Sequence, residues 1–338
     1  MNILTEQQKK TLSLGFVGVG WIGKNRMDVL LQSGLATADV IAEPSAANAT
    51  EALLSSPSAK IANSPEAVFE DPDLDGIVIA TPSAHHGSQS FQALLSNKAV
   101  FCQKPLGRTA SEVKEVVKAS QRTNQYLAVD LSYRYTKALS AVHQTVSSGQ
   151  IGKVYAAELV FHNAYGPDKP WFYDINQSGG GCVMDLGIHL IDMALWCLGF
   201  PKIESITSQL YHGGKVLDTP PTEAEDFAVV TMTTEAGAVI SINCSWNISA
   251  GQDAVIEAKF YGTQGGAAFR NVNGSFYDFK AEKYSGTQTE ILFEGPDEWS
   301  GRAGVAWADK VLSGQGYDDV SAAELLQTAE AIDRIYGR

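Results

Sequence analysis

The feature that most constrains the fold is a glycine pattern close to the start of the chain. An apolar run over residues 12–19 leads into Gly-Val-Gly-Trp-Ile-Gly at residues 18–23. The next segment carries Met27, Leu30 and Leu31 at a spacing of three and one residues, which places them on one side of a helix. The sequence therefore predicts a strand, a tight glycine turn and a helix in immediate succession.

The acidic residue that follows makes this pattern typical of a dinucleotide-binding turn. A second strand, residues 38–42, ends at Glu43, which lies 20 residues after Gly23. Glycines at these positions let a pyrophosphate approach the helix N-terminus, and a carboxylate at this distance accepts hydrogen bonds from ribose hydroxyl groups. A plain glycine-rich strand–helix turn is the alternative. The residues predicted to bind the dinucleotide here are Gly18, Gly20, Trp21, Ile22, Gly23 and Glu43.

The same carboxylate predicts which nicotinamide dinucleotide is preferred. Glu43 would repel a 2′-phosphate, and no arginine follows it within several residues. The sequence therefore favours NAD, although Ser45 leaves room for NADP.

Two later strands of the first half end in polar residues. The run 76–80 is continuously apolar and β-branched, as expected for a strand buried on both faces, and residues 99–102 form the next strand. Ligands in open parallel sheets bind at the carboxyl ends of the strands. The residues at these two ends, which we expect to border the dinucleotide, are Thr81, His86, Gln103 and Lys104. A surface loop is the alternative for the histidine.

The pattern changes after about residue 136, where long strands replace the alternation of strands and helices. A strand is predicted over 154–161, and further strands over 203–211, 227–233, 239–246, 254–261 and 267–270. Their order indicates an antiparallel sheet. The division predicts two domains, residues 1–135 and residues 136–338.

Between these strands, Gly179 to Gly199 predicts a helix with a buried stripe. Asp185 and His189 are four residues apart, so they share one face near its N-terminus. A carboxylate beside an imidazole can orient the ring for proton transfer. A helical ion pair at the surface is the alternative reading of this spacing.

Composition excludes several classes of partner. The formal charge is −13, from 25 basic and 38 acidic residues, which argues against nucleic acid or an anionic membrane. No run approaches 18 consecutive apolar residues, and the first residues lack a signal-peptide core. The four cysteines show no metal-binding spacing, so we expect reduced thiols, no metal site and a cytoplasmic location.

Three motifs in this order resemble those of the glucose–fructose oxidoreductase, inositol dehydrogenase and rhizopine-catabolism (Gfo/Idh/MocA) family. They are the glycine pattern at 18–23, Gln103-Lys104-Pro105 and Asp185-x-x-x-His189, and the resemblance covers nearly the whole chain. It implies an α/β fold, with an N-terminal Rossmann domain and a C-terminal α/β domain that has a large, mainly antiparallel open-faced sheet. It also implies NAD(P)-dependent oxidation or reduction of a sugar, cyclitol or related polyol.

The resemblance assigns the chemistry to three residues. Lys104 matches the lysine of the family's Glu-Lys-Pro signature, and Asp185 and His189 match its paired acid and histidine. We expect His189 to be the general base, Lys104 to stabilise the alkoxide, and Asp185 to orient the substrate or the imidazole. Gln103 departs from the family's usual glutamate, so its hydrogen bonds must differ.

The substrate contacts and the assembly are further expectations. Trp171 and Tyr173 are predicted to stack on a sugar ring and His162 to point into the cleft; packing within the loop and a polar strand end are the alternatives. The family commonly pairs through its open sheet, which implies a homodimer or homotetramer. Two other functions stay open, a glycosidase of this fold that uses NAD transiently and an NAD(P)-binding regulator without catalysis.

Overall fold

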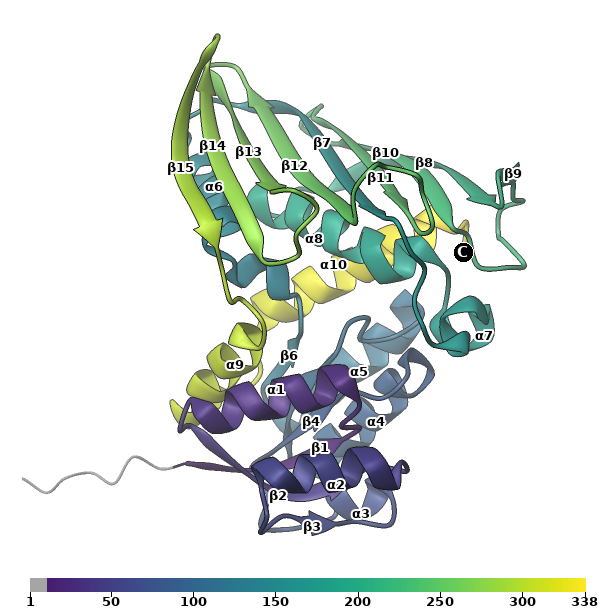
Figure 1. Cartoon of the computed structure of the whole chain (residues 1–338), viewed down its shortest axis with the longest axis vertical. Coiled ribbons are helices and arrows are strands. Elements are labelled where there is room, and N and C mark those ends of the chain that lie inside the picture. Colours follow the sequence, from purple (N-terminus) through teal and green to yellow (C-terminus); the bar gives the residue numbers. More distant parts are fainter. Residues whose placement is uncertain (1–10) are drawn as a thin grey trace, which may run out of the picture.

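The computed structural model describes residues 11–338, which form two lobes, each built on one β-sheet (Figure 1). The first lobe alternates strands and helices. Its elements are β1 (Leu12–Val17), α1 (Trp21–Gln32), β2 (Ala36–Ala42), α2 (Ala46–Ser55), β3 (Lys60–Ile61), α3 (Pro65–Phe69), β4 (Gly76–Ile79), α4 (Ser83–Leu95), β5 (Ala99–Cys102), α5 (Ala110–Thr123) and β6 (Leu127–Val129). All six strands are parallel in the order β3-β2-β1-β4-β5-β6, which confirms the predicted Rossmann domain.

Helices cover both faces of this sheet, which explains why its central strands are apolar throughout. Ile77 and Ile79 of β4 pack among residues of α4 and α5, whereas Val78 packs on the other face among residues of α1. All four residues of β4 are buried. Burial on both faces removes the alternation of polar and apolar residues that a half-exposed strand would show.

The second lobe contains the larger sheet. Its elements are η1 (Ser132–Tyr135), α6 (Lys137–Ser147), β7 (Val154–Asn163), η2 (Pro170–Tyr173), α7 (Ile175–Ser178), η3 (Val183–Gly187), α8 (Ile188–Cys197), β8 (Ile203–His212), β9 (Lys215–Val216), β10 (Phe227–Thr234), β11 (Val239–Ser245), β12 (Ala254–Gly262), β13 (Gly265–Asn271), β14 (Asp278–Ser285), β15 (Gln288–Pro296), α9 (Arg302–Leu312) and α10 (Asp319–Ile335). The strand order is β15-β14-β13-β12-β7-β11-β10-β8-β9, and the pairing is antiparallel except between β7 and β11. The predicted mainly antiparallel sheet is confirmed; β14 and β15 extend it beyond the predicted strands.

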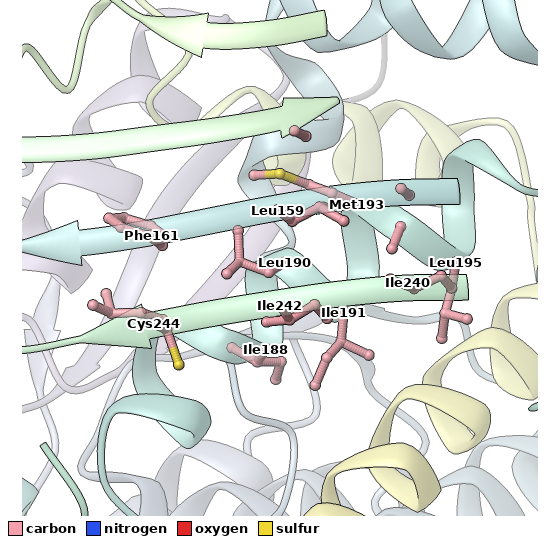
Figure 2. Packing of buried hydrophobic residues seen from close by; sticks show 14 of the residues in the cluster. Leu159, Phe161, Ile188, Leu190, Ile191, Met193, Leu195, Ile240, Ile242 and Cys244 are labelled. Carbon is pink, nitrogen blue, oxygen red and sulfur yellow. The ribbon is translucent and has the colours of Figure 1, made fainter. Parts of the chain in front are cut away.

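The helices of the second lobe cover one face of the large sheet (Figure 1). Alternate residues of β7 and β11 point toward α8 and meet its apolar side chains (Figure 2). The labelled side chains in this core are Leu159, Phe161, Ile188, Leu190, Ile191, Met193, Leu195, Ile240, Ile242 and Cys244. Because α8 packs directly on the sheet, the position of η3 just before it is fixed by the core.

The chain crosses back into the first lobe near its end. Trp307 of α9 is buried in the core of the first lobe, with its ring centroid 5.8 Å from that of Phe101 on β5. A side chain on Gly76 would contact this tryptophan at 2.9 Å, which accounts for a glycine at the start of β4. A division after residue 135 therefore separates the two sheets, but α9 lies beyond that division and packs in the first lobe.

The stretch 175–197 is long and apolar enough to cross a membrane, with a mean hydropathy of 1.3. Its apolar window is 89% buried inside the fold, however, and α8 forms the centre of the second core. It is therefore the core helix of a folded domain.

The other face of the large sheet carries a group of valines among polar side chains. Val160, Val229 and Val255 are partly exposed or exposed, and Val239 is 40% exposed. Cross-strand register places Val229, Asn243 and Val160 in one row across β10, β11 and β7. This face offers apolar surface that a second copy of the chain could cover.

We expect the protein to be a homodimer or homotetramer in solution that pairs through this face. Light scattering at micromolar concentration measures the mass. The double substitution Val229→Lys and Val239→Lys should shift the mass toward the monomer, because it places charges in the apolar contact. The matched control is Val216→Lys, at an exposed valine on the edge strand β9. A monomer mass for the unaltered chain contradicts the prediction.

Candidate active site

A cleft of about 890 Å³ lies between the lobes at the carboxyl ends of the parallel strands. Its lining includes side chains of both lobes, so the sites predicted in the two halves of the sequence form one cavity. The predicted residues that line it are Gly20, Trp21, Ile22, Thr81, His86, Gln103, Lys104, Trp171, Asp185 and His189.

The glycine turn has the shape that a dinucleotide requires. Gly18 has a φ of +83°, and a side chain on Gly23 would overlap the carbonyl oxygen of Gly18. At Gly20, by contrast, a side chain would meet nothing closer than an Asn48 nitrogen at 4.0 Å, so the backbone there faces open space. The N-terminus of α1 has no side-chain cap, which leaves its N–H groups available to a pyrophosphate.

Glu43 lies at the end of β2, beside this turn. Its carboxylate accepts hydrogen bonds from the N–H of Val19 at 2.8 Å and the N–H of Ser45 at 2.9 Å. The glutamate therefore stabilises the turn through these two main-chain hydrogen bonds. Its charge lies at the position predicted for the ribose end of the cofactor.

His86 connects the ends of β4 and β5. Its Nδ1 lies 2.7 Å from the carbonyl oxygen of Pro105 and its Nε2 lies 2.6 Å from that of Thr81. Burial lowers the pKa of His86, so the ring is neutral and donates from one nitrogen only. The ring lies between these two carbonyl groups, donates to one of them, and packs beside the loop that carries Lys104.

Lys104 and Asp185 form an ion pair across the two lobes. Lys104 Nζ donates to Asp185 Oδ1 at 2.6 Å and to the main-chain oxygen of Asp185 at 2.7 Å. The other carboxylate oxygen, Oδ2, accepts the indole N–H of Trp246 at 3.1 Å. The carboxylate is thus oriented by one charged and one neutral donor, from the first lobe and from the end of β11.

Asp185 and His189 do not pair with each other in the described residues, contrary to one expectation from their spacing. Residues Val183–Gly187 form the π-helical turn η3, which has a wider turn than an α-helix and changes the angle between positions four apart. Asp185 consequently points to Lys104 and Trp246, whereas the ring of His189 meets Tyr133 edge-on at 5.0 Å.

His189 is 9% exposed and borders the cleft. Burial, together with the positive charges of Lys104 and Arg26, holds the pKa of His189 well below the ordinary histidine value. The imidazole is therefore neutral at physiological pH and able to accept a proton.

A buried carboxylate that sequence patterns did not reveal fixes the start of the helical segment that carries Asp185 and His189. Glu225 is fully buried and accepts hydrogen bonds from the N–H groups of Gly181 and Val183, at 2.9 and 2.8 Å, and from the hydroxyl of Tyr336 at 2.8 Å. Burial raises the pKa of Glu225, and these three donors oppose the shift. The residue lies 44 and 42 positions from Gly181 and Val183 and 111 positions from Tyr336, so no local signal marks it.

Gln103 belongs to a buried polar network around Asp130. Its amide donates to Asp130 Oδ2, and Arg26 Nε donates to the same oxygen at 2.5 Å. Arg26 also donates to the hydroxyl of Ser300 at 2.7 Å, which connects α1 with the segment before α9. The amide at position 103 is explained by this network, because a glutamate there would face the carboxylate of Asp130.

The three predicted substrate contacts differ in their placement. Trp171 lines the cleft, where its ring stacks on Phe172 at 3.8 Å. The Tyr173 hydroxyl donates to the carbonyl oxygen of Pro167, and His162 lies 2.7 Å from the Ser245 hydroxyl. Neither of these two side chains lines the cleft, so their placement gives no support to a substrate contact.

We expect Gln103→Glu to destabilise the protein by about 2 kcal/mol at neutral pH, because it buries a second carboxylate against Asp130. Thermal denaturation measured at pH 5 and pH 8 checks this. The loss should be larger at pH 8, where both carboxylates are charged. The double variant Gln103→Glu with Asp130→Asn is the matched control and should recover stability; equal melting temperatures for all three proteins would refute the role of the network.

Comparison with known proteins gives the family. Residues 12–131 match the model of the oxidoreductase family with an NAD-binding Rossmann fold, and residues 139–268 match the model of the GFO/IDH/MocA C-terminal domain. The uncharacterized oxidoreductase YrbE of Bacillus subtilis is 31% identical over 208 residues, 60% of this chain and 58% of that protein. The match thus spans less than two thirds of that relative.

Two further comparisons cover more of the chain. The levoglucosan dehydrogenase of Pseudarthrobacter phenanthrenivorans is 27% identical over 77% of this chain and 74% of its own length. A solved levoglucosan dehydrogenase in complex with NADH and levoglucosan superposes with a TM-score of 0.81, at 22% identity, over 96% of each chain. The fold, the resemblance and the nicotinamide cofactor expected from the sequence are confirmed. The chain belongs to the Gfo/Idh/MocA family of nicotinamide-dependent oxidoreductases.

Proposed function

We propose that this enzyme oxidises a secondary alcohol of a sugar, cyclitol or related polyol and transfers the hydride to NAD. The observation that carries this proposal is the convergence of Lys104, Asp185 and a neutral His189 in the cleft that begins at the glycine turn. The relative named levoglucosan dehydrogenase supports a carbohydrate substrate. The reverse reduction uses the same groups.

A nicotinamide held at the glycine turn would supply the hydride acceptor for this reaction. The protein must then remove the hydroxyl proton and stabilise the charge that develops on oxygen. His189 takes the proton on a ring nitrogen, because its pKa is held low and the neutral form predominates. In the reductive direction the protonated ring returns it.

Lys104 stabilises the reacting oxygen. A lysine ammonium has three N–H donors, and two of them point to oxygens of Asp185. The third remains for the substrate oxygen, and the positive charge favours the alkoxide form. Asp185 acts through Lys104. Its two hydrogen bonds hold the ammonium in one orientation, so that only one N–H is directed to the substrate.

Substitution of either proton-handling residue should abolish most of the turnover. Lys104→Ala and His189→Ala should each lower kcat by about 10²–10⁴-fold with little change in NAD binding, because both act at the reacting oxygen. Steady-state kinetics and quenching of tryptophan fluorescence by NADH measure the two effects. In the unaltered enzyme, oxidation should stay constant as the pH falls to 6.5 and decrease only below it, because His189 must be neutral.

Two substitutions outside the cleft serve as matched controls, Lys153→Ala and His143→Asn, and both should retain normal kinetics. Near-normal turnover of Lys104→Ala or His189→Ala on a substrate that the unaltered enzyme oxidises would remove that residue from the mechanism.

The cofactor preference provides a separate test. We expect kcat/KM to be at least about tenfold higher with NAD than with NADP, because the Glu43 carboxylate repels a 2′-phosphate. Glu43→Gln removes the charge but keeps only one of the two side-chain oxygens that accept from Val19 and Ser45, so it should reduce the preference and cost one hydrogen bond to the turn. Equal efficiency of the unaltered enzyme with both cofactors would contradict the prediction.

A further inference from the structure

An aromatic wall, formed by Tyr133, Trp299 and Tyr277, extends along the cleft from His189. The ring of Tyr133 lies 5.0 Å from that of His189, Trp299 stacks on Tyr133 at 5.2 Å, and Tyr277 stacks on Trp299 at 6.0 Å. All three line the cleft, although they come from η1, from the segment before α9 and from the turn before β14. The wall therefore begins at the proposed base and runs away from it.

The wall offers the cleft aromatic ring surface, and the indole donor of its middle ring is already used. The indole N–H of Trp299 donates to the carbonyl oxygen of Phe276 at 2.9 Å, so this donor is already used. Tyr133 is buried, and Tyr277 at the outer end is 39% exposed. A ligand that reaches His189 has to pack against aromatic rings along this side.

A second aromatic group reaches the cleft beside Asp185. Trp171 and Phe172 of η2 line the cleft and stack on each other at 3.8 Å. Phe172 meets Trp246 edge-on at 6.4 Å, and Trp246 donates to Asp185. The reacting groups are thus bordered by aromatic surface from two separate parts of the second lobe.

The charged side chains of the cleft neutralise one another. Among the described residues that line it, three are basic and three are acidic, and each basic group has its own acidic partner. The pairs are Arg26 with Asp130 at 2.5 Å, Lys104 with Asp185 at 2.6 Å, and Lys169 with Asp168 at 2.7 Å.

An anionic substrate would therefore find no unpaired cation in the cleft. A phosphate or carboxylate loses water when it enters a cavity lined by aromatic rings, and a partner of opposite charge or a set of free N–H groups must offset that cost. The free N–H groups at the N-terminus of α1 lie at the glycine turn, where the cofactor is expected. The one pair at the solvent-exposed rim, Lys169 with Asp168, is too well hydrated to provide more than weak attraction. A ring with an apolar face and uncharged hydroxyl groups avoids the cost of burying a charge without a partner.

We propose that the substrate is an uncharged cyclic polyol or glycoside whose apolar ring face packs against the aromatic wall. This inference rests on the polyol dehydrogenase function proposed above and narrows it. It excludes sugar phosphates, uronates and nucleotide sugars as the favoured substrates of this enzyme.

The first experiment compares matched pairs of compounds that differ in charge. The full chain with saturating NAD is assayed with methyl glucoside and methyl glucuronide, myo-inositol and its monophosphate, and glucose and UDP-glucose. We expect kcat/KM to be at least about 100-fold higher for the neutral member of each pair that reacts, equivalent to one uncompensated charge. An anionic member that reacts as well as its neutral partner overturns the proposal.

The second experiment removes the outer ring of the wall. Tyr277→Ala should raise KM for the neutral substrate about tenfold with a smaller change in kcat, because it removes contact area and leaves the reacting groups in place. Tyr277→Phe keeps the ring and should behave normally, as should Tyr155→Ala at an exposed tyrosine on β7 outside the cleft. An unchanged KM in Tyr277→Ala overturns the proposal that the substrate ring packs against the aromatic wall.

Binding separates failure of this inference from failure of the proposed function. The same compounds are titrated against the NADH-bound protein while tryptophan fluorescence is recorded. Binding of the neutral members without turnover in either direction refutes the dehydrogenase assignment and supports the substrate class. Turnover or binding restricted to anionic members refutes the substrate class and leaves the dehydrogenase assignment standing.

Discussion

The ion pair between Lys104 and Asp185 is the interaction on which the arrangement of the site depends. It joins the end of β5 in the first lobe to η3 in the second, and its side chains are only 19% and 16% exposed. Charges shielded this far from water are stable only while they stay together, because separation would leave each one incompletely solvated. The relative position of the lobes and the orientation of the Lys104 ammonium are therefore coupled. The lysine is oriented before a substrate arrives, so binding does not have to bear that ordering cost.

The second partner of this pair is held in place by glycines and a buried carboxylate. A side chain on Gly181 would overlap the main chain of Glu225, and one on Gly180 would overlap the hydroxyl of Tyr336. The two glycines let the segment just before β10 and the residue just after α10 approach the start of η3. There, Glu225 accepts hydrogen bonds from two main-chain N–H groups. The glycine run thus has a structural purpose, which is to allow this close approach. It fixes the start of the segment that carries Asp185 and His189.

Sequence reasoning succeeded where the signal is local and periodic. The turn at residues 18–23, the parallel strands and most strands of the second sheet follow from glycine positions and from alternation of apolar residues. β14 was missed because only Phe279 and Ala281 mark its alternation, which stops at the register shift between Ala281 and Glu282. The roles of Trp246 and Trp299 depend on contacts between segments far apart in sequence. The π-helical turn η3 likewise arises from tertiary packing, so the spacing of Asp185 and His189 suggested a pairing that the fold does not make.

The charge balance around His189 explains why an amide stands at position 103. The ring is kept neutral by burial and by the positive charges of Lys104 and Arg26. Asp130 and Asp185 already neutralise these two cations formally, one carboxylate each. A glutamate at position 103 would add a third negative charge to two cations, and a net negative surrounding favours the protonated imidazole. Gln103 supplies the hydrogen bond that Asp130 accepts without that charge. The departure from the family's usual residue therefore helps to keep His189 neutral, which is the property that its proposed role as a base requires.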